Sequence, residues 1–281
     1  MAPAVSEKVQ RLTVSLPEGG SDVRAVSQYL YDLGRTDGLP VVPPAEELVE
    51  EMLRFTDRAP GEVIGHVQPC QAPATVESIG VNAVMAGCRP EYLPVLIAAV
   101  EAVCDPAFNL YGIQATTNPV APLIVVNGPL ARELKINSQG NCFGQGFMAN
   151  ATIGRAFRFV LTNIGGGIPQ TMDKATHGQP AKFGFCIAEN EADSPWEPLH
   201  VERGYAVETT TVTLISVTGT QNILDYASKT GRGVLQMLCS HAGTAGVQNV
   251  LLGGGPLFAL SPEHAEIMAR DGFSKQDVRQ F

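Results

Sequence analysis

Cys88 is the residue whose type and position most directly suggest chemistry. It lies in VMAGCRPEYLPV (84–95), between a glycine and Arg89, just before a proline that suits the first position of a helix. Backbone N–H groups at a helix start and the Arg89 charge favour an anion, so the segment predicts a lowered thiol pKa. A thiolate nucleophile indicates covalent hydrolysis, transfer or addition–elimination. The alternative is a small side chain filling a corner between helices, since free cysteine is often buried.

Three further residues are candidates for proton transfer beside such a thiolate. His66 and His241 could shuttle protons, and Glu189 follows an expected strand, where a carboxylate could act as acid or base. The five histidines lack the H-E-x-x-H or Cys-x-x-Cys spacing of a metal site, so we assign no metal ligands. A cation held by Glu189, Glu191 and His200 is the alternative. The sequence identifies no cofactor.

Candidate substrate-binding residues are arginines, amides and glycines in or beside loops. Asn150 is expected to cap a helix on which Arg155 and Arg158 lie three residues apart, so that both could face one side. Arginine suits a carboxylate or phosphate through forked hydrogen bonds, and loop amides often orient ligands. The glycines of NIGGGIP (163–169) could present N–H groups to an anion or simply reverse the chain, and they match neither dinucleotide-binding nor P-loop motifs. The predicted set is Arg89, Asn118, Asn150, Arg155, Gly165, Gly166 and Gly167.

These residues depend on helices and strands that bring them together. Apolar spacing and helix-end signals predict helices at about 21–33, 45–55, 75–87, 90–104, 151–163, 222–239 and 262–271, with Thr75 as the cap of the third. Alternating and β-branched patterns predict strands at 61–67, 111–117, 122–126, 182–191, 208–219 and 249–254. The mixed order indicates an α/β or α+β fold, a mixed sheet with several packed helices. Two helix starts with Pro-Glu leave open two pseudo-equivalent halves.

The chain is long enough for one large core. With 281 residues, 44% of them hydrophobic, we expect a single globular domain at 21–281 after a tail or edge strand at 1–20. A subdivision near 165–180 is the alternative. Ser274 and Asp277 predict a capping box for a last helix of two turns, and this abrupt end suggests a truncated C-terminus.

Charge and hydropathy exclude several partner classes. The 19 basic and 28 acidic residues give a net charge of −9, which argues against nucleic acid and anionic membranes as partners. No apolar run reaches the roughly 18 residues of a membrane span, and the N-terminus lacks the order of a secretory signal. We therefore expect a cytoplasmic protein. Its six cysteines contain no C-x-x-C pair, which argues against a disulfide framework.

Four segments carry a resemblance to a known family. DGLPVVPP, NAVMAGCRPEYLPV, ATIGRAFRFVLTN and ENEADSPWEP resemble an uncharacterised bacterial protein family, over residues 37–281. The resemblance implies no activity and no site residue. It implies a longer C-terminus and small cysteine- or selenocysteine-containing companion proteins.

Three functions remain open from the sequence. The first is an enzyme, a hydrolase, lyase or oxidoreductase, that acts on a small polar or anionic molecule through the Cys88 thiolate, as a homo-oligomer. The second is a subunit of a thiol- or selenol-dependent redox enzyme, with part of the reactive group on a small partner protein. The third is a non-catalytic binding protein for an anionic metabolite.

Overall fold

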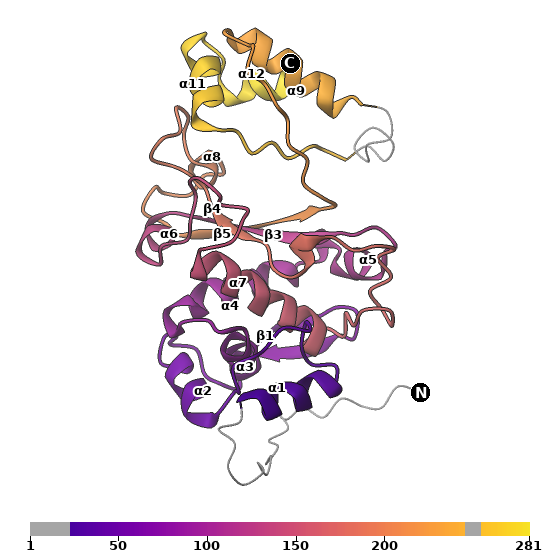
Figure 1. Ribbon diagram of the computed structural model, residues 1–281. Coiled ribbons are helices and arrows are strands. Elements are labelled where there is room, and N and C mark those ends of the chain that lie inside the picture. Colours follow the sequence, from indigo (N-terminus) through magenta and orange to yellow (C-terminus); the bar gives the residue numbers. More distant parts are fainter. Residues whose placement is uncertain (1–22, 245–253) are drawn as a thin grey trace. The chain divides into compact units, whose positions relative to one another are not determined.

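The computed structural model describes residues 23–244 and 254–281, and this part divides into two compact units (Figure 1). The first unit contains the described residues up to 189 together with 208–219, and the second contains 190–207 and those from 220 to 281. The division therefore lies later in the chain than the expected subdivision near 165–180. The tail at 1–20 and nearly all of the strand expected at 249–254 lie outside the described residues.

A mixed three-stranded sheet lies in the first unit. Its order is β4 (Cys186–Ala188), β3 (Ala121–Asn127) and β5 (Thr211–Val217). β3 runs parallel to β4 and antiparallel to β5, which confirms the predicted mixed sheet with packed helices. Every residue of β3 is buried, and all of them except the last, Asn127, are apolar, as is typical of a central strand covered on both faces. Neighbouring side chains of β3 point to opposite faces of the sheet, so Leu123 and Ile124 belong to two separate apolar clusters.

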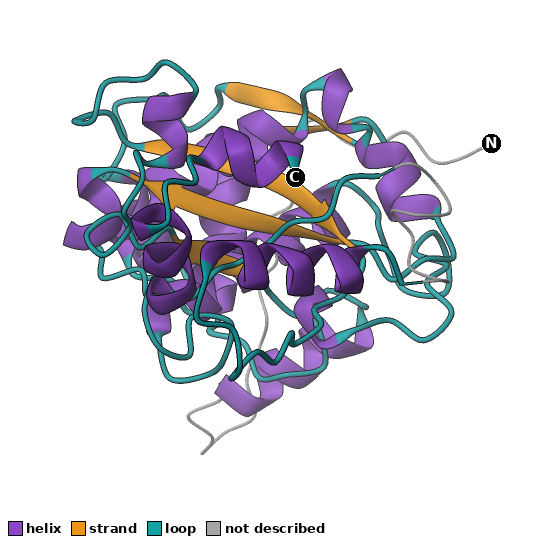
Figure 2. Ribbon diagram, turned by 90° about the horizontal axis from the view of Figure 1, so that it is seen from above, coloured by secondary structure: helices purple, strands orange, loops and turns teal. Residues whose placement is uncertain are grey.

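Helices stack beneath this sheet in layers (Figure 1). α4 (Leu93–Val103), which follows the 3-10 turn η1 (Pro90–Tyr92), and α7 (Met148–Phe159) contact the sheet, and α3 (Val76–Ala86) packs against both. α2 (Glu46–Leu53) packs on α3 in turn. Seven of the eleven α4 residues are buried, so the main core lies between these helices. Helices dominate over strands throughout (Figure 2).

Local sequence signals determine where α3 begins and ends. β1 (Val63–Val67) and β2 (Ala72–Thr75) form an antiparallel hairpin that leads directly into this helix. The Thr75 hydroxyl accepts a hydrogen bond from the Ser78 N–H at 3.1 Å, which satisfies a donor that the first turn leaves unpaired. The helix ends at Gly87, whose φ of 83° suits a residue without a side chain. The predicted helix and its cap are confirmed.

One predicted element is wrong. The strand expected at 111–117 is helical, in α5 (Leu110–Ala115). Asn109 adopts a left-handed conformation and its side chain accepts from the Gly112 N–H, so it starts a helix where apolar alternation suggests a strand. The remaining short elements of this unit are α1 (Val23–Asp32), η2 (Pro106–Phe108), α6 (Pro129–Glu133) and η4 (Pro180–Lys182).

The second unit is helical within its described residues. Its elements are α8 (Leu199–Glu202), α9 (Gly231–Ala242), α11 (Pro262–Arg270) and α12 (Lys275–Gln280). The predicted helix 262–271 and the capping box of Ser274 and Asp277 are confirmed. Among the described residues strands occur only in the first unit, so the described parts of the two units differ in secondary structure and give no support to two pseudo-equivalent halves.

Glu202 connects two elements of the second unit, α8 and α12. Arg279 donates hydrogen bonds to both of its carboxylate oxygens, the second at 2.9 Å, and Lys275 lies 3.4 Å away. These contacts, chiefly the Arg279 hydrogen bond, hold the pKa of Glu202 below its usual range. The indole N–H of Trp196 donates to the Phe273 carbonyl at 3.0 Å in the same unit.

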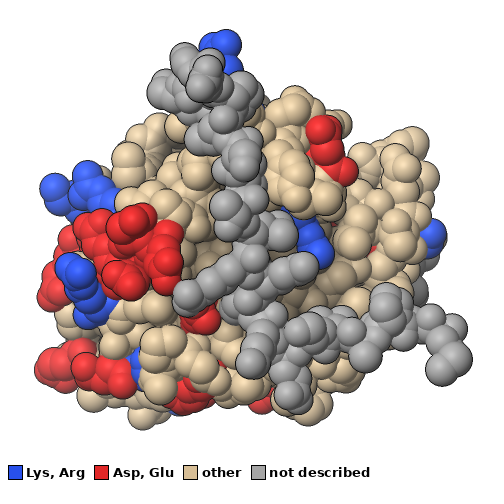
Figure 3. Space-filling view, turned by 90° about the horizontal axis from the view of Figure 1, so that it is seen from below, with Lys and Arg blue, Asp and Glu red and all other residues tan. Residues whose placement is uncertain are grey.

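The surface carries both signs of charge. Figure 3 shows one face, on which the largest group of charged side chains is acidic. In α2 the four glutamates Glu46, Glu47, Glu50 and Glu51 are exposed. Among the described residues, no single helix combines the length and apolar character of a membrane span. Within residues 23–244 and 254–281, one pair of helices, Pro90–Val103 and Pro106–Ala115, passes this test together, and it is bent by 73°.

Candidate functional site

The candidate site lies along α7 and the π-helical turn η3 (Val160–Ile164) that continues it. π-Helical turns are rare and recur at functional sites. Gly154 allows α7 to lie close to the segment before β4, since a Cβ there would come within 2.5 Å of the Phe185 nitrogen. The helix is therefore pressed against the chain that carries Gly184 and Phe185, and both line a cavity beside it.

Arg155 joins two distant segments of the sequence. Its Nε and Nη2 donate to the two carboxylate oxygens of Asp37 at 2.7 and 2.9 Å. Nη2 also donates to the carbonyls of Leu39 and Pro40 at 3.3 and 2.8 Å. The guanidinium carbon lies 5.0 Å from the ring centroid of Phe159. The sequence predicts that Arg155 holds a substrate. In the structure its donors instead bind the DGLPVVPP segment and fix that segment to α7.

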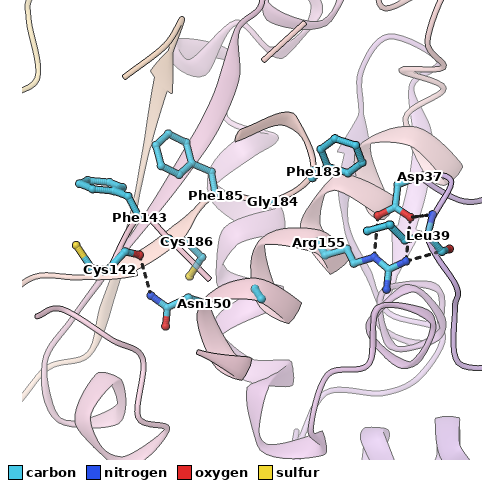
Figure 4. A pocket seen from close by; sticks show the side chains of 12 residues that line it. Asp37, Leu39, Cys142, Phe143, Asn150, Arg155, Phe183, Gly184, Phe185 and Cys186 are labelled. Carbon is cyan, nitrogen blue, oxygen red and sulfur yellow. Dashed lines mark hydrogen bonds and ion pairs between the residues drawn. The ribbon is translucent and has the colours of Figure 1, made fainter. Parts of the chain in front are cut away.

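A first cavity of about 220 Å³ lies beside the Arg155–Asp37 pair. Figure 4 shows the pair at one end and Phe143 and Phe185 at the other, with Asn150 and Cys186 beside the two phenylalanines. Its other lining residues are Leu39, Cys142, Gly144, Ala151, Phe183 and Gly184. The wall is thus mainly aromatic and aliphatic away from the ion pair.

Asn150 lines this cavity but its amide is engaged by a loop. Its Oδ1 accepts from the Asn137 N–H at 2.7 Å and its Nδ2 donates to the Asn137 carbonyl at 2.9 Å. The side chain is only 5% exposed. Asn150 does not cap the helix as predicted, since α7 begins at Met148, three residues before the expected start, and Phe147 is its N-cap. Its amide holds the loop after α6 against the helix instead of facing a ligand.

A second cavity of about 160 Å³ follows the first along the same helix. Two cationic side chains, Arg158 and Lys182, line it, together with the hydroxyl-bearing Thr36 and Thr162 and the carboxylate of Asp173. Its remaining lining residues are Asp37, Phe159, Gly167, Pro169 and Phe183. Lys182 lies 2.7 Å from the Asp173 carboxylate, and both side chains are largely buried. Burial is the main cause that lowers the pKa of Lys182, and Arg158 lowers it further.

Arg158 differs from its neighbour Arg155 in its partners. Among the described residues, none forms a hydrogen bond with the Arg158 guanidinium, and Asp173 acts on it only through a longer-range electrostatic interaction. Burial lowers the pKa of Arg158, although a guanidinium stays charged. A desolvated cation without hydrogen-bonded partners is unfavourable unless an anion joins it. The site therefore has an unused charged donor.

The charges around the second cavity leave a positive excess. Arg155, Arg158 and Lys182 contribute three positive charges, and Asp37 and Asp173 contribute two negative ones, which leaves one positive charge. This excess arises in a chain whose net charge is −9. A monoanion would neutralise it.

Cys88 lies in a different environment from the one predicted. Arg89 is the N-cap of η1 and Pro90 its first residue, as expected. However, the thiol packs against the main apolar core and lines neither cavity. Burial raises the pKa of Cys88 to about 12, and the hydrogen bond with Thr152 and the Arg155 charge offset only part of this. The prediction of a lowered thiol pKa is wrong, because desolvation outweighs the helix start.

The glycine triplet also serves another purpose than the one predicted. The N–H groups of Gly165, Gly166 and Gly167 donate to carbonyls of the π turn, at 3.1, 3.1 and 3.0 Å. None of the three is therefore available to an anion. A Cβ at Gly165 would lie 2.6 Å from the Gln68 carbonyl oxygen, and one at Gly167 would lie 2.1 Å from Gln114. These glycines end the helix where other segments approach closely.

The other predicted residues are not gathered around the cavities. His66 is exposed on β1, Arg89 is exposed and 3.7 Å from Glu91, and Asn118 precedes β3. His241 belongs to the second unit. None of these four lines either cavity.

Glu189 keeps its expected place directly after a strand, β4. It accepts a hydrogen bond from the buried Asn127 amide at 2.5 Å, and it lines neither cavity. Glu191 and His200, the other suggested cation ligands, belong to the second unit, with their side chains 3.7 Å apart. Within residues 23–244 and 254–281, no group of three His, Cys, Asp or Glu side chains is placed to hold a metal ion.

The sequence prediction missed Lys182, Asp173, Thr36 and Thr162, and it considered Arg158 beside Arg155 but kept only Arg155 in the predicted set. Only the pairing of Arg155 and Arg158, three residues apart on one helix face, gave a signal. Lys182 and Asp173 come from an irregular stretch with no periodic pattern. Comparison of the chain with known protein families, with curated proteins and with solved structures gives no match.

Proposed function

We propose that this protein binds a small carboxylate in the second cavity, with Arg158 as the principal ligand-binding residue. The observation that carries the proposal is the partly buried guanidinium in the cavity wall, to which no described residue is hydrogen-bonded. A carboxylate would accept two parallel hydrogen bonds from it, the geometry that arginine favours. Lys182 and the Thr36 and Thr162 hydroxyls would add donors at the same place.

Of the three functions considered from the sequence, the binding protein for an anionic metabolite agrees best with these contacts. An enzyme built on Cys88 needs a thiolate, and burial disfavours that form. The two cysteines that line the first cavity, Cys142 and Cys186, also have raised pKa values because of burial. No thiol beside either cavity is thus prepared for nucleophilic attack. A redox subunit gains no support from the described contacts.

The proposal is tested by calorimetric titration with sodium butyrate, sodium sulfate and sodium phosphate. We expect butyrate to bind with a stoichiometry of one, and Arg158→Gln to weaken it at least about tenfold, because a hydrogen bond to a charged group contributes about 1.5–3 kcal/mol. The matched control is Arg89→Gln, which removes an arginine exposed outside both cavities. It should leave binding unchanged.

Stability measurements separate a binding defect from misfolding. Arg158→Gln removes a buried charge that no hydrogen bond compensates, so its thermal midpoint without ligand should equal or exceed that of the wild type. Equal butyrate affinity in the two proteins, or no butyrate binding to the folded wild type, would overturn the proposal. If sulfate or phosphate binds more tightly than butyrate, the proposal of a carboxylate ligand is wrong and the site binds an inorganic anion.

A further inference from the structure

The two cavities follow one face of a single helix. Ala151 and Arg155 line the first, and Arg158, Phe159 and Thr162 line the second. Their spacing of four, three, one and three residues places all five on the same face of the helix. From Ala151 to Arg158 the helix rises by roughly 10 Å. The cavities are therefore consecutive along α7.

The cavities also share part of their walls. Asp37 and Phe183 line both. The two oxygens of Asp37 are hydrogen-bonded to Arg155, so the shared wall presents a neutralised ion pair instead of a free carboxylate. Phe183 is 53% exposed, which leaves its ring available to a molecule that extends from one cavity into the other.

The first cavity has the chemistry of an apolar tail site. Phe143 and Phe185 lie with ring centroids 5.6 Å apart, in a tilted arrangement. Phe143 is 46% exposed and Leu39 is 50% exposed, although both line the cavity. Aromatic and aliphatic surface left open beside a charged site is typical of a pocket for a mainly apolar ligand with one polar end.

We infer that the two cavities together bind an amphipathic monocarboxylic acid. Its carboxylate would lie at Arg158, and its alkyl or aryl tail would follow α7 past Phe183 into the cavity lined by Phe143. The single positive excess of the site matches one carboxylate. This inference rests on the proposed function, because the carboxylate end is the ligand proposed there.

The test is a calorimetric titration series with acetate, butyrate, hexanoate and octanoate, with 1-hexanol as the uncharged counterpart. We expect affinity to rise about fourfold for each added methylene, the factor for its transfer from water, up to the tail length that fills roughly 10 Å along the helix. Because 1-hexanol lacks the carboxylate, it should bind at least tenfold more weakly than hexanoate.

Phe143→Ala tests the position of the tail. We expect it to weaken octanoate at least tenfold and to leave acetate unchanged, because acetate reaches only the Arg158 end. The matched control is Phe55→Ala, at a phenylalanine equally exposed (46%) that lines neither cavity. This control should change neither affinity.

The outcomes separate the two proposals. If acetate and octanoate bind equally and both require Arg158, the tail site is refuted while the carboxylate site stands. If no alkanoate binds the folded protein, the proposed function itself fails. Octanoate binding that neither Arg158→Gln nor Phe143→Ala weakens would indicate nonspecific partition, and it would overturn both.

Discussion

The ion pair between Asp37 and Arg155 allows a quantitative test of what holds the site together. Asp37→Asn removes the negative partner of a pair whose side chains are 8% and 17% exposed. Losing one partner of a buried pair costs about 3–5 kcal/mol, because the remaining charge is left uncompensated. Arg155 keeps two backbone carbonyls, so we expect the lower end, about 3 kcal/mol, in the free energy of unfolding of the first unit.

The assay is urea unfolding, followed by far-ultraviolet circular dichroism and by hydrogen exchange of the α7 amides. The single tryptophan, Trp196, belongs to the second unit, so its fluorescence reports that unit separately and should not change. The matched control is Glu62→Gln, which breaks the 2.8 Å pair with Arg58. These two side chains are 39% and 36% exposed, and such a pair contributes only about 0.2–1 kcal/mol.

A double variant completes the test. Asp37→Asn combined with Arg155→Gln leaves neither charge unpaired, so its loss of stability should be smaller than the sum of the two single losses. The reasoning is refuted if Asp37→Asn costs no more than Glu62→Gln, or if the two single losses simply add. Either result would mean that the ion pair adds little to the contacts that hold the DGLPVVPP segment on α7, namely packing and the hydrogen bonds of Arg155 to the Leu39 and Pro40 carbonyls.

Three further predictions concern other parts of the chain. With a pKa raised to about 12, Cys88 should stay unmodified by iodoacetamide at pH 8 while exposed Cys70 reacts; peptide mass mapping that finds Cys88 alkylated first would contradict this. Gly154→Ala places a Cβ 2.5 Å from a backbone nitrogen and should cost about 1–3 kcal/mol in urea unfolding, whereas Gly140→Ala, with open space around it, should stay within about 0.5 kcal/mol. Because the folded-state pKa of Glu202 is depressed, the second unit should lose stability as pH falls from about 4.3 through the lower folded value. Glu202→Gln should flatten this acid-induced change in tryptophan fluorescence, and an unaltered profile would count against the pairing.

The elements with strong local signals could be predicted from the sequence. Thr75 before an apolar helix and Ser274 three residues before Asp277 are contiguous capping patterns, and both operate as expected. The apolar strand at β3 was equally clear. The strand expected at 111–117 failed because a single side chain, Asn109, starts a helix there. That choice depends on one backbone conformation, which apolar alternation does not reveal.

The site was less accessible to such reasoning, because its chemistry depends on burial. A helix start predicted an acidic thiol at Cys88, but the surrounding core raises its pKa. Two nearby arginines looked interchangeable, yet Asp37 engages one of them and leaves the other to the cavity. The partner of Arg155 lies 118 residues away in the chain, and no local pattern encodes such a pairing.

Because α7 continues into a π turn, the fold of this region depends on the exact number of residues in the turn. A π turn contains one residue more than the α-helical path would need, so deleting one residue within 160–164 would restore a regular helix. Everything downstream would then rotate by about 100° about the helix axis, carrying the glycine triplet away from Gln68 and Gln114. A variant that lacks one residue of the turn would have almost the same apolar composition but a different arrangement of this region. The number of residues in the turn therefore matters as much as their identity.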